Sequence, residues 1–176
     1  MRILITGARG LLGSAIFTYL NNKFVKIEAF DRSDFSWNEI NKNVEKFKNF
    51  DCIIHAAANT NAEECEIDPE SCYRDNALFT ERLAIAASLS DCKFIYISST
   101  GIYGTEKISE PYTEYDWVNP TTHHHNSKWL GEKAVTEHLK DYLILRAGWI
   151  FGGSTLNRKN FVARIIDEGL NAKNQQ

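Results

Sequence analysis

Three glycines near the start of the chain, Gly7, Gly10 and Gly13, form a turn that could bind a phosphate group. They follow the short apolar run 3–5 and precede a segment whose apolar residues recur with helical spacing. A helix N-terminus offers an anion unpaired N–H groups and the positive end of its dipole. Glycine lets the backbone approach that anion closely. The spacing G-x-x-G-x-x-G differs from the commonest dinucleotide fingerprint, so a turn with an ordinary helix cap is the alternative.

Asp31 lies beyond this turn, at the end of a second apolar run. A carboxylate there can accept hydrogen bonds from the hydroxyls of an adenosine ribose, and it would repel a 2′-phosphate. Arg9 and Arg32 act in the opposite direction, because either guanidinium could pair with a 2′-phosphate. We therefore expect NAD or NADP as the cofactor, with NAD slightly favoured. The alternative for Asp31 is a solvated loop carboxylate.

The elements that would position these residues alternate between short apolar runs and longer helical patterns. This alternation predicts an α/β fold, a doubly wound parallel sheet with helices on both faces. The expected strands are 2–6, 24–30, 52–55, 94–97 and 142–145. The expected longer helices are one directly after the glycine turn, then 75–90, 127–139 and a last one around 161–166. Small or polar residues follow the end of every expected strand, and this edge of the sheet is where open α/β folds bind ligands.

Composition limits the class of protein. The chain has 176 residues, of which 43% are hydrophobic and 24% charged, as in a soluble globular domain, and we expect a single domain over residues 1–176. The formal net charge of −3 gives no reason to expect nucleic acid or an anionic membrane as a partner. No apolar run approaches the ~20 residues of a membrane span, and no signal peptide is expected. The four cysteines form no C-x-x-C pair, so we predict reduced thiols, no metal site and a cytoplasmic location.

Further sequence patterns follow the later strands. They are Asp34-Phe35, His55-Ala56-Ala57-Ala58, Ser98 to Gly104, Ser127 to Glu132 and Leu145 to Gly152. Together with the glycine turn, they resemble the motifs of extended short-chain dehydrogenases/reductases, above all dTDP-4-dehydrorhamnose reductases and NAD-dependent sugar-nucleotide epimerases and dehydratases. The resemblance covers nearly the whole chain and implies a Rossmann-type fold. With the reasoning above, it predicts these cofactor-binding residues: Gly7, Arg9, Gly10, Leu11, Leu12, Gly13, Asp31, Arg32, Asp34, Phe35, Ala56, Ala57, Ala58, Lys128, Ala147 and Trp149.

The resemblance also implies a catalytic hydroxyl and a catalytic lysine. Counting back from Tyr103 puts the hydroxyl on Ser99, with Thr100 as the alternative. Lys128 matches the family's lysine, which binds the nicotinamide ribose. In the family, a tyrosine one helical turn before the lysine gives a proton to the substrate carbonyl as hydride arrives from the nicotinamide.

This sequence departs from the family at that tyrosine, because His124 stands four residues before Lys128. Positions i and i+4 share a helix face, so both side chains can point into the cleft. Histidine titrates near pH 6.5, so His124 could donate the proton, although a charged Lys128 would make it a poorer donor. The hydroxyls of Ser99, Thr100 and Tyr103 are possible substitutes.

A second departure from the family is length, since its members carry later segments that form a substrate lobe, and we expect that lobe to be largely missing here. The resemblance implies NAD(P)-dependent oxidoreduction of a nucleotide-linked sugar, with reduction of a 4-keto sugar first and epimerisation or dehydration second. A dinucleotide-binding regulatory subunit without turnover, or a fragment of a longer enzyme, is the alternative. An unprotected edge of the sheet further predicts self-association.

Overall fold

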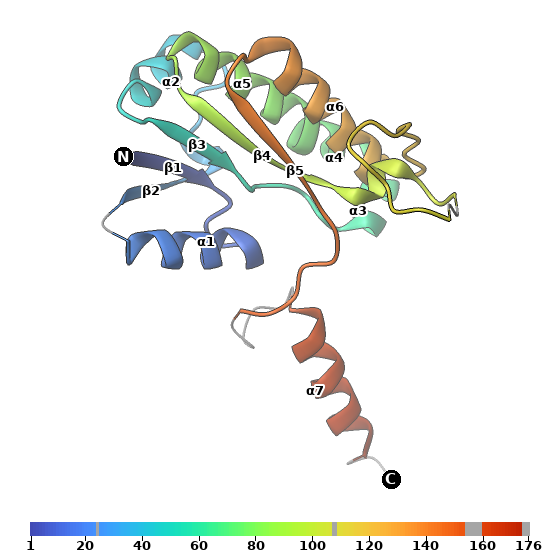
Figure 1. The fold of residues 1–176 in the computed structure, drawn as a ribbon. Coiled ribbons are helices and arrows are strands. Elements are labelled where there is room, and N and C mark those ends of the chain that lie inside the picture. The colour runs from blue at the N-terminus through green and yellow to red at the C-terminus, as the bar shows by residue number, and fades with distance from the viewer. Residues whose placement is uncertain (24, 107–108, 154–159, 174–176) are drawn as a thin grey trace.

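Five parallel strands form one sheet in the order β2-β1-β3-β4-β5 in the computed structural model (Figure 1). The structure describes residues 1–23, 25–106, 109–153 and 160–173. The strands are β1 (Arg2–Thr6), β2 (Lys26–Phe30), β3 (Cys52–His55), β4 (Lys93–Ser99) and β5 (Tyr142–Ala147). All four strand pairings are parallel, which confirms the predicted doubly wound sheet. The order of the strands reverses between β1 and β3, and an open α/β sheet is expected to hold its ligand crevice at the carboxyl ends of the strands at this point.

Helices and turns connect the strands. They are α1 (Leu11–Asn21), the 3₁₀ turn η1 (Arg32–Asp34), α2 (Ile40–Phe47), α3 (Ala62–Ile67), α4 (Pro69–Tyr73), the π-helical turn η2 (Arg74–Leu78), α5 (Phe79–Leu89), the 3₁₀ turn η3 (Thr100–Tyr103), α6 (His123–His138) and α7 (Phe161–Lys173). Helix α6 begins four residues before the predicted start, because the Thr122 side chain accepts a hydrogen bond from the His125 N–H and caps the helix. His124 therefore lies inside the helix rather than in a loop.

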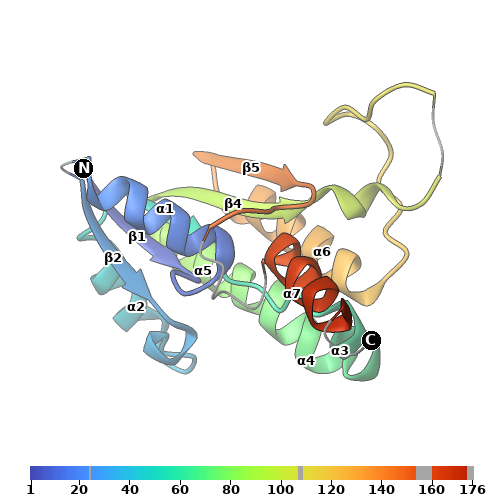
Figure 2. The same ribbon diagram turned by 90° about the horizontal axis from the view of Figure 1, so that it is seen from below.

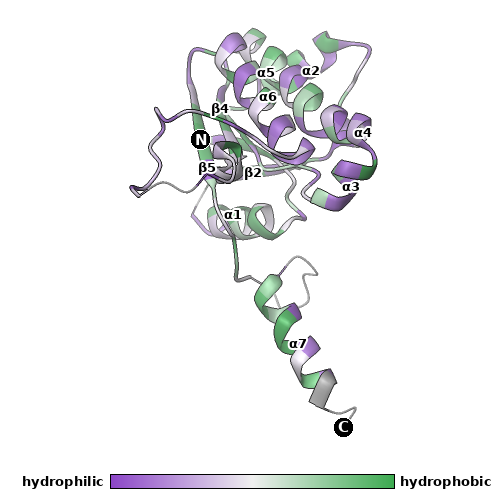
Figure 3. Ribbon diagram, turned by 90° about the vertical axis from the view of Figure 1, so that its right-hand side faces the viewer, coloured by the Kyte–Doolittle hydropathy of each residue, from purple (hydrophilic) through white to green (hydrophobic). Residues whose placement is uncertain are grey.

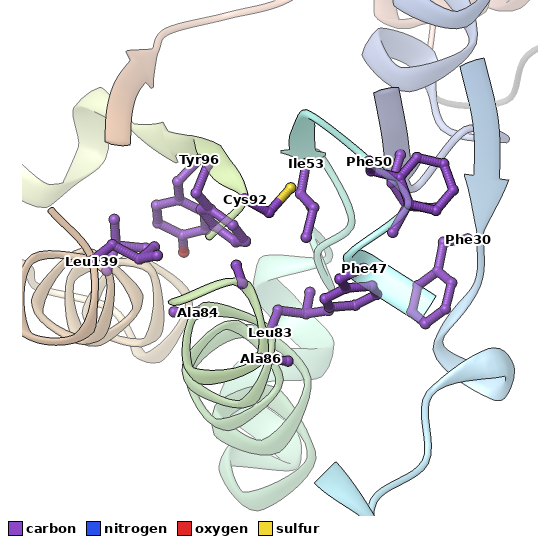
Figure 4. Close-up of a cluster of buried hydrophobic side chains, with 14 of the residues drawn as sticks. Phe30, Phe47, Phe50, Ile53, Leu83, Ala84, Ala86, Cys92, Tyr96 and Leu139 are labelled. Carbon is purple, nitrogen blue, oxygen red and sulfur yellow. The ribbon is translucent and has the colours of Figure 1, made fainter. Parts of the chain in front are cut away.

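Alternate residues of each strand face opposite sides of the sheet, and one side is densely covered. Leu4, Ile53 and Phe94 point toward α2, α5 and α6, where they join Leu83 and Val135 in one core cluster. Figure 4 shows this cluster, with Leu83 and Ala84 of α5 facing side chains of the strands such as Ile53 and Tyr96. The predicted buried character of the 75–90 segment is confirmed, although a π-helical turn interrupts it before α5 begins.

The opposite side of the sheet is covered only in part. Helix α1 packs on Ile3, Ile5 and Ile54, at the end of the sheet formed by β1, β2 and β3 (Figure 2). On β5, Leu143 and Leu145 lie on this same side and are about half exposed, at 50% and 45%. The β5 end of this face therefore carries apolar side chains that the described residues do not cover.

Helix α7 projects away from the sheet and its packed helices (Figures 1 and 3). Its apolar side chains are exposed, including Phe161, Ile165 and Leu170. Trp149, on the segment that leads from β5 toward α7, is also exposed and contacts the Phe161 ring. No helix in the described part of the chain has the length and apolar character to span a membrane.

Candidate functional site

A cavity of about 750 Å³ opens at the carboxyl ends of β1, β3, β4 and β5, and we call it the first cavity. Its wall includes most of the site residues predicted from the sequence. These are Gly7, Gly10, Leu11, Leu12, Gly13, Ala56, Ala57, Ala58, Ser99, Thr100, His124, Lys128, Ala147 and Trp149. The structure thus brings the glycine turn, the ends of the inner strands and the start of α6 around one space.

The glycine turn forms a cradle at the N-terminus of α1. Gly7 has a φ of +72°, and a Cβ there would lie 2.7 Å from the backbone nitrogen of Ala57. A Cβ on Gly13 would strike the carbonyl of Gly7. Gly10 differs from both, because the nearest atom to a Cβ there is the Gly7 oxygen at 3.2 Å. Gly7 and Gly13 are therefore required for close packing of strand and helix, whereas Gly10 keeps the cradle open.

The cradle fits a phosphate group. Gly10 is the N-cap of α1, and no side chain caps this helix. The first turn of α1 therefore keeps N–H groups that a phosphate oxygen can accept from. Ser98 on the wall of the first cavity offers a second group to a ligand, because its buried Oγ has no hydrogen-bond partner among the residues that the structure describes. A buried hydroxyl left in this way is costly unless a ligand or water bonds to it.

The predicted adenosine-binding residues lie after β2, outside the wall of the first cavity. Asp31 is bound by Arg9, with 2.7 Å between Oδ2 and Nη2, and its backbone N–H donates to Asp34. Arg32 instead pairs with Asp75, which raises the pKa of the guanidinium. Arg9 is largely exposed, so its side chain is the less constrained of the two arginines.

Phe35 was predicted to flank the adenine, and the structure places its ring in the core. It is 5% exposed and meets Phe30 and Phe79 edge to face. Its role in cofactor binding stays a prediction, as do the roles of Arg9, Asp31, Arg32 and Asp34.

His124 reaches the first cavity in a defined tautomer. Its Nδ1 lies 3.0 Å from the carbonyl oxygen of Asn59, and a carbonyl can only accept, so Nδ1 carries the proton. The Asn76 side chain fixes Asn59, donating to its carbonyl and accepting from its N–H. Burial, with smaller contributions from the charges of His125 and Lys128, lowers the pKa of His124 to about 4. At neutral pH the ring is therefore uncharged and Nε2 is an acceptor.

Lys128 lies one helical turn further along α6 and is 4% exposed. Its Nζ is 4.2 Å from the centre of the Tyr96 ring, which supports the ammonium by a cation–π contact. Burial lowers the pKa of Lys128 to about 7, and the charge of Glu132 opposes this shift. Lys128 can therefore hold or release a proton in the neutral range, which His124 cannot.

Tyr103 lies away from the first cavity. Its hydroxyl donates to the Thr113 carbonyl at 2.8 Å and accepts from Arg146 Nη1 at 2.6 Å. The ring stacks on Tyr112, and both line a second cavity of about 760 Å³ beside β5 and α6. The side-chain hydroxyls on the wall of the first cavity are those of Thr60, Ser98, Ser99 and Thr100 rather than that of Tyr103.

Eight residues on the first cavity's wall were not predicted as site residues: Thr60, Ala62, Ile97, Ser98, Gly101, His125, Gly148 and Ile150. Ile97 could have been found from strand alternation, because it shares a side of β4 with Ser99. The position of His125 on the wall could be predicted only with the true start of α6, which the Thr122 cap determines. Within the described residues, no cluster of three His, Cys, Asp or Glu side chains could hold a metal ion.

A parallel doubly wound sheet with a glycine cradle after β1 and a cavity at the strand ends defines a Rossmann-like protein. Within that class the chain belongs to the RmlD substrate binding domain family, whose model matches residues 1–176. This confirms the resemblance that the motifs predicted.

Individual relatives agree with this assignment. The chain is 28% identical to a dTDP-4-dehydrorhamnose reductase of Mycolicibacterium smegmatis, over 93% of this chain and 50% of the relative. The crystal structure of a dTDP-4-dehydrorhamnose reductase from Bacillus anthracis, in complex with NADP, is 30% identical with a TM-score of 0.86, covering 97% of this chain and 60% of that one. The chain is also 31% identical to methionine adenosyltransferase 2 subunit beta of Bos taurus, over 95% of this chain and 52% of that relative. The chain thus spans about half the length of the curated relatives it matches.

Proposed function

We propose that this chain forms the dinucleotide-binding and catalytic part of an NAD(P)-dependent reductase that acts on a nucleotide-linked 4-keto sugar. The observation that carries the proposal is the shared cavity: the glycine cradle of α1 and the side chains of Ser99, His124 and Lys128 line the same space. Family membership and the names of the reductase relatives support the substrate class. Epimerisation or dehydration of such a sugar is the second reaction that the same cofactor supports.

The residues present suit distinct parts of a dinucleotide. Gly10 and the first turn of α1 would hold the pyrophosphate, and Asp31 with Arg9 would meet the adenosine ribose. Lys128 would hold the nicotinamide ribose, beside Ala147 and Trp149. When bound, the nicotinamide supplies or accepts hydride. The Asp31 carboxylate favours NAD, whereas the exposed Arg9 and the NADP bound by the Bacillus anthracis relative favour NADP.

The proton that reduction of a carbonyl requires has several sources on this wall. His124 takes the tyrosine's position, but as a neutral ring protonated on Nδ1 it offers Nε2 as an acceptor. It would then orient a substrate hydroxyl or take a proton in the oxidative direction. The hydroxyls of Ser99 and Thr100 would fix the substrate oxygen, and the Lys128 ammonium is the acid whose pKa suits neutral pH.

Isothermal titration with NADH and NADPH, followed by a turnover assay on dTDP-4-keto-6-deoxy sugar, tests this proposal. We expect binding of at least one dinucleotide and cofactor-dependent loss of the keto sugar. Failure of both dinucleotides to bind would contradict the proposal.

Four buried free cysteines further support a cytoplasmic site of action, where thiols stay reduced.

A second candidate is a dinucleotide-binding subunit without turnover. The neutral His124 in the tyrosine's position favours it, and so does the bovine relative named as a subunit of methionine adenosyltransferase 2. This candidate predicts dinucleotide binding in the same titration and no consumption of keto sugar in the assay. The two measurements together therefore separate the candidates.

A further inference from the structure

Lys128 and Glu132 lie four residues apart on α6, a spacing at which a lysine and a glutamate commonly pair. In this protein Glu132 pairs with Arg146 instead of Lys128. Arg146, on β5, donates from Nε to Glu132 Oε1 at 3.1 Å and from Nη2 to Oε2 at 2.8 Å. Both oxygens of this buried carboxylate are therefore committed to a guanidinium from another element.

Arg146 is itself held from the side of the second cavity. Its Nη1 donates to the hydroxyl of Tyr103 at 2.6 Å and to the carbonyl of Glu114 at 3.3 Å. The guanidinium also lies over the Tyr103 ring. A planar group with five donors can serve these partners and both oxygens of Glu132 at once, which a lysine could not.

Within the described part of the chain, the groups around Lys128 leave its ammonium without an anionic partner. Tyr96 from β4 faces it with its ring, and His55 from β3 is buried, with a pKa far below its usual value. His124, one turn earlier on α6, is also neutral near pH 7. Glu132 is the carboxylate whose charge acts on Lys128, and the fork from Arg146 holds both of its oxygens.

We propose that Arg146 is a positioning residue: by holding both oxygens of Glu132, it keeps the Lys128 ammonium free to donate to a ligand in the first cavity. Arg146 itself faces the second cavity and has no place on the wall of the first. That the ligand is the ribose of a dinucleotide rests on the function proposed above. The positioning of Lys128 does not depend on that function.

The test follows the titration of the Lys128 side chain by NMR in the protein without ligand, with Lys128→Arg used to assign the signal. In the wild type we expect a midpoint near 7. In Arg146→Met, Glu132 is released and can pair with Lys128, so the midpoint should rise by about 1–3 pH units. Arg146→Lys should give a smaller rise. A lysine ammonium still neutralises Glu132 in part, but it binds the carboxylate less firmly than the two-pronged guanidinium does.

A double variant separates positioning from a general structural role. Glu132→Gln together with Arg146→Met removes both charges, so the Lys128 midpoint should stay at or below that of the wild type. Arg82→Met, on the exposed side of α5, is the matched control and should leave the midpoint unchanged. An unchanged midpoint in both Arg146→Met and Arg146→Lys would overturn the proposal, as would equal rises in the single and double variants. If Arg146→Met fails to fold, the Lys128 midpoints of Arg146→Lys and of the double variant still decide whether Arg146 positions Lys128.

Binding of NADH tests the consequence for the ligand. At pH 6, where Lys128 is charged in the wild type, Arg146→Met should bind NADH ~10-fold more weakly, the effect of losing about one charge-assisted hydrogen bond. The double variant should recover most of this affinity. A raised Lys128 midpoint with unchanged NADH affinity would overturn the claim that the free ammonium serves the ligand. If no variant binds NADH, including the wild type, the proposed function fails, and the NMR titration still decides whether Arg146 positions Lys128.

Discussion

The two ends of the sheet differ in how completely they are packed. At β1, β3 and β4, Leu4, Ile53 and Phe94 are wholly buried under α5 and its neighbours, and the glycine cradle is fixed by backbone contacts. At β5, Leu143 and Leu145 are about half exposed. We call the densely packed part of the sheet at β1, β3 and β4 the complete end, and we call β5 with α7, which present exposed apolar surface, the open end.

Truncation of one leucine side chain at each end gives the largest expected contrast. Leu83→Ala removes a wholly buried side chain of α5 and should cost about 2–5 kcal/mol of unfolding free energy. Leu145→Ala, on the open side of β5, should cost less than about 1 kcal/mol. Urea unfolding monitored by circular dichroism measures both. Equal costs would show that Leu145 is packed as tightly as the core.

The Asp31→Ala variant tests the complete end through the relative affinities for NADH and NADPH. Removing a charged hydrogen-bond acceptor typically costs about 1.5–3 kcal/mol, so Asp31→Ala should weaken NADH binding by roughly 10- to 100-fold. It also releases Arg9 from its ion pair, so NADPH should lose less affinity than NADH. Isothermal titration with both dinucleotides measures the change. A wild type that binds NADPH much more tightly than NADH would show that Arg9 dominates over Asp31.

The open end should associate with itself or with further protein. Exposed apolar strands and helices recruit partners, and Leu143 and Ile165 lie on two such surfaces. Analytical ultracentrifugation should show concentration-dependent oligomers in the wild type. Leu143→Glu and Ile165→Glu should reduce them, while Glu63→Gln, at an exposed position on α3, should not. A wild type that stays monomeric at high concentration would remove the contrast between the two ends.

The sequence predicted the complete end of the molecule more fully than the open end. Glycine spacing and apolar runs are local signals, and they correctly indicated the cradle, β1 and β3. The Arg146–Glu132 pair was not foreseen, because its members are distant in sequence and only the contact of β5 with α6 joins them. The burial of Phe35 was missed for a similar reason, since its aromatic neighbours come from β2 and α5.

A further prediction concerns His124 and acid stability. Its pKa is lowered to about 4 in the folded protein, while an unfolded histidine titrates near 6.5. The unfolded state therefore binds more protons between these values, so the contribution of His124 to stability is present above pH 6.5 and is lost as the pH falls toward 4. His124→Gln should flatten the fall of the melting temperature over this range. His55 is buried with a lowered pKa as well, so part of the slope should persist. An unaltered slope would show that His124 is charged or exposed in solution.

The central claim, that the first cavity binds a dinucleotide, depends most directly on Gly10. A valine side chain at Gly10 would enter the cradle, and its Cβ would lie 3.2 Å from the Gly7 oxygen, a tight contact that a shift of a few tenths of an ångström relieves. Titration with the preferred dinucleotide should show at least ~100-fold weaker binding to Gly10→Val, with the melting temperature nearly unchanged, because a side chain there displaces the pyrophosphate from the α1 N-terminus. Gly169→Val, on α7 with open space around it, is the matched control and should bind as the wild type does. Unchanged affinity in Gly10→Val would contradict the account.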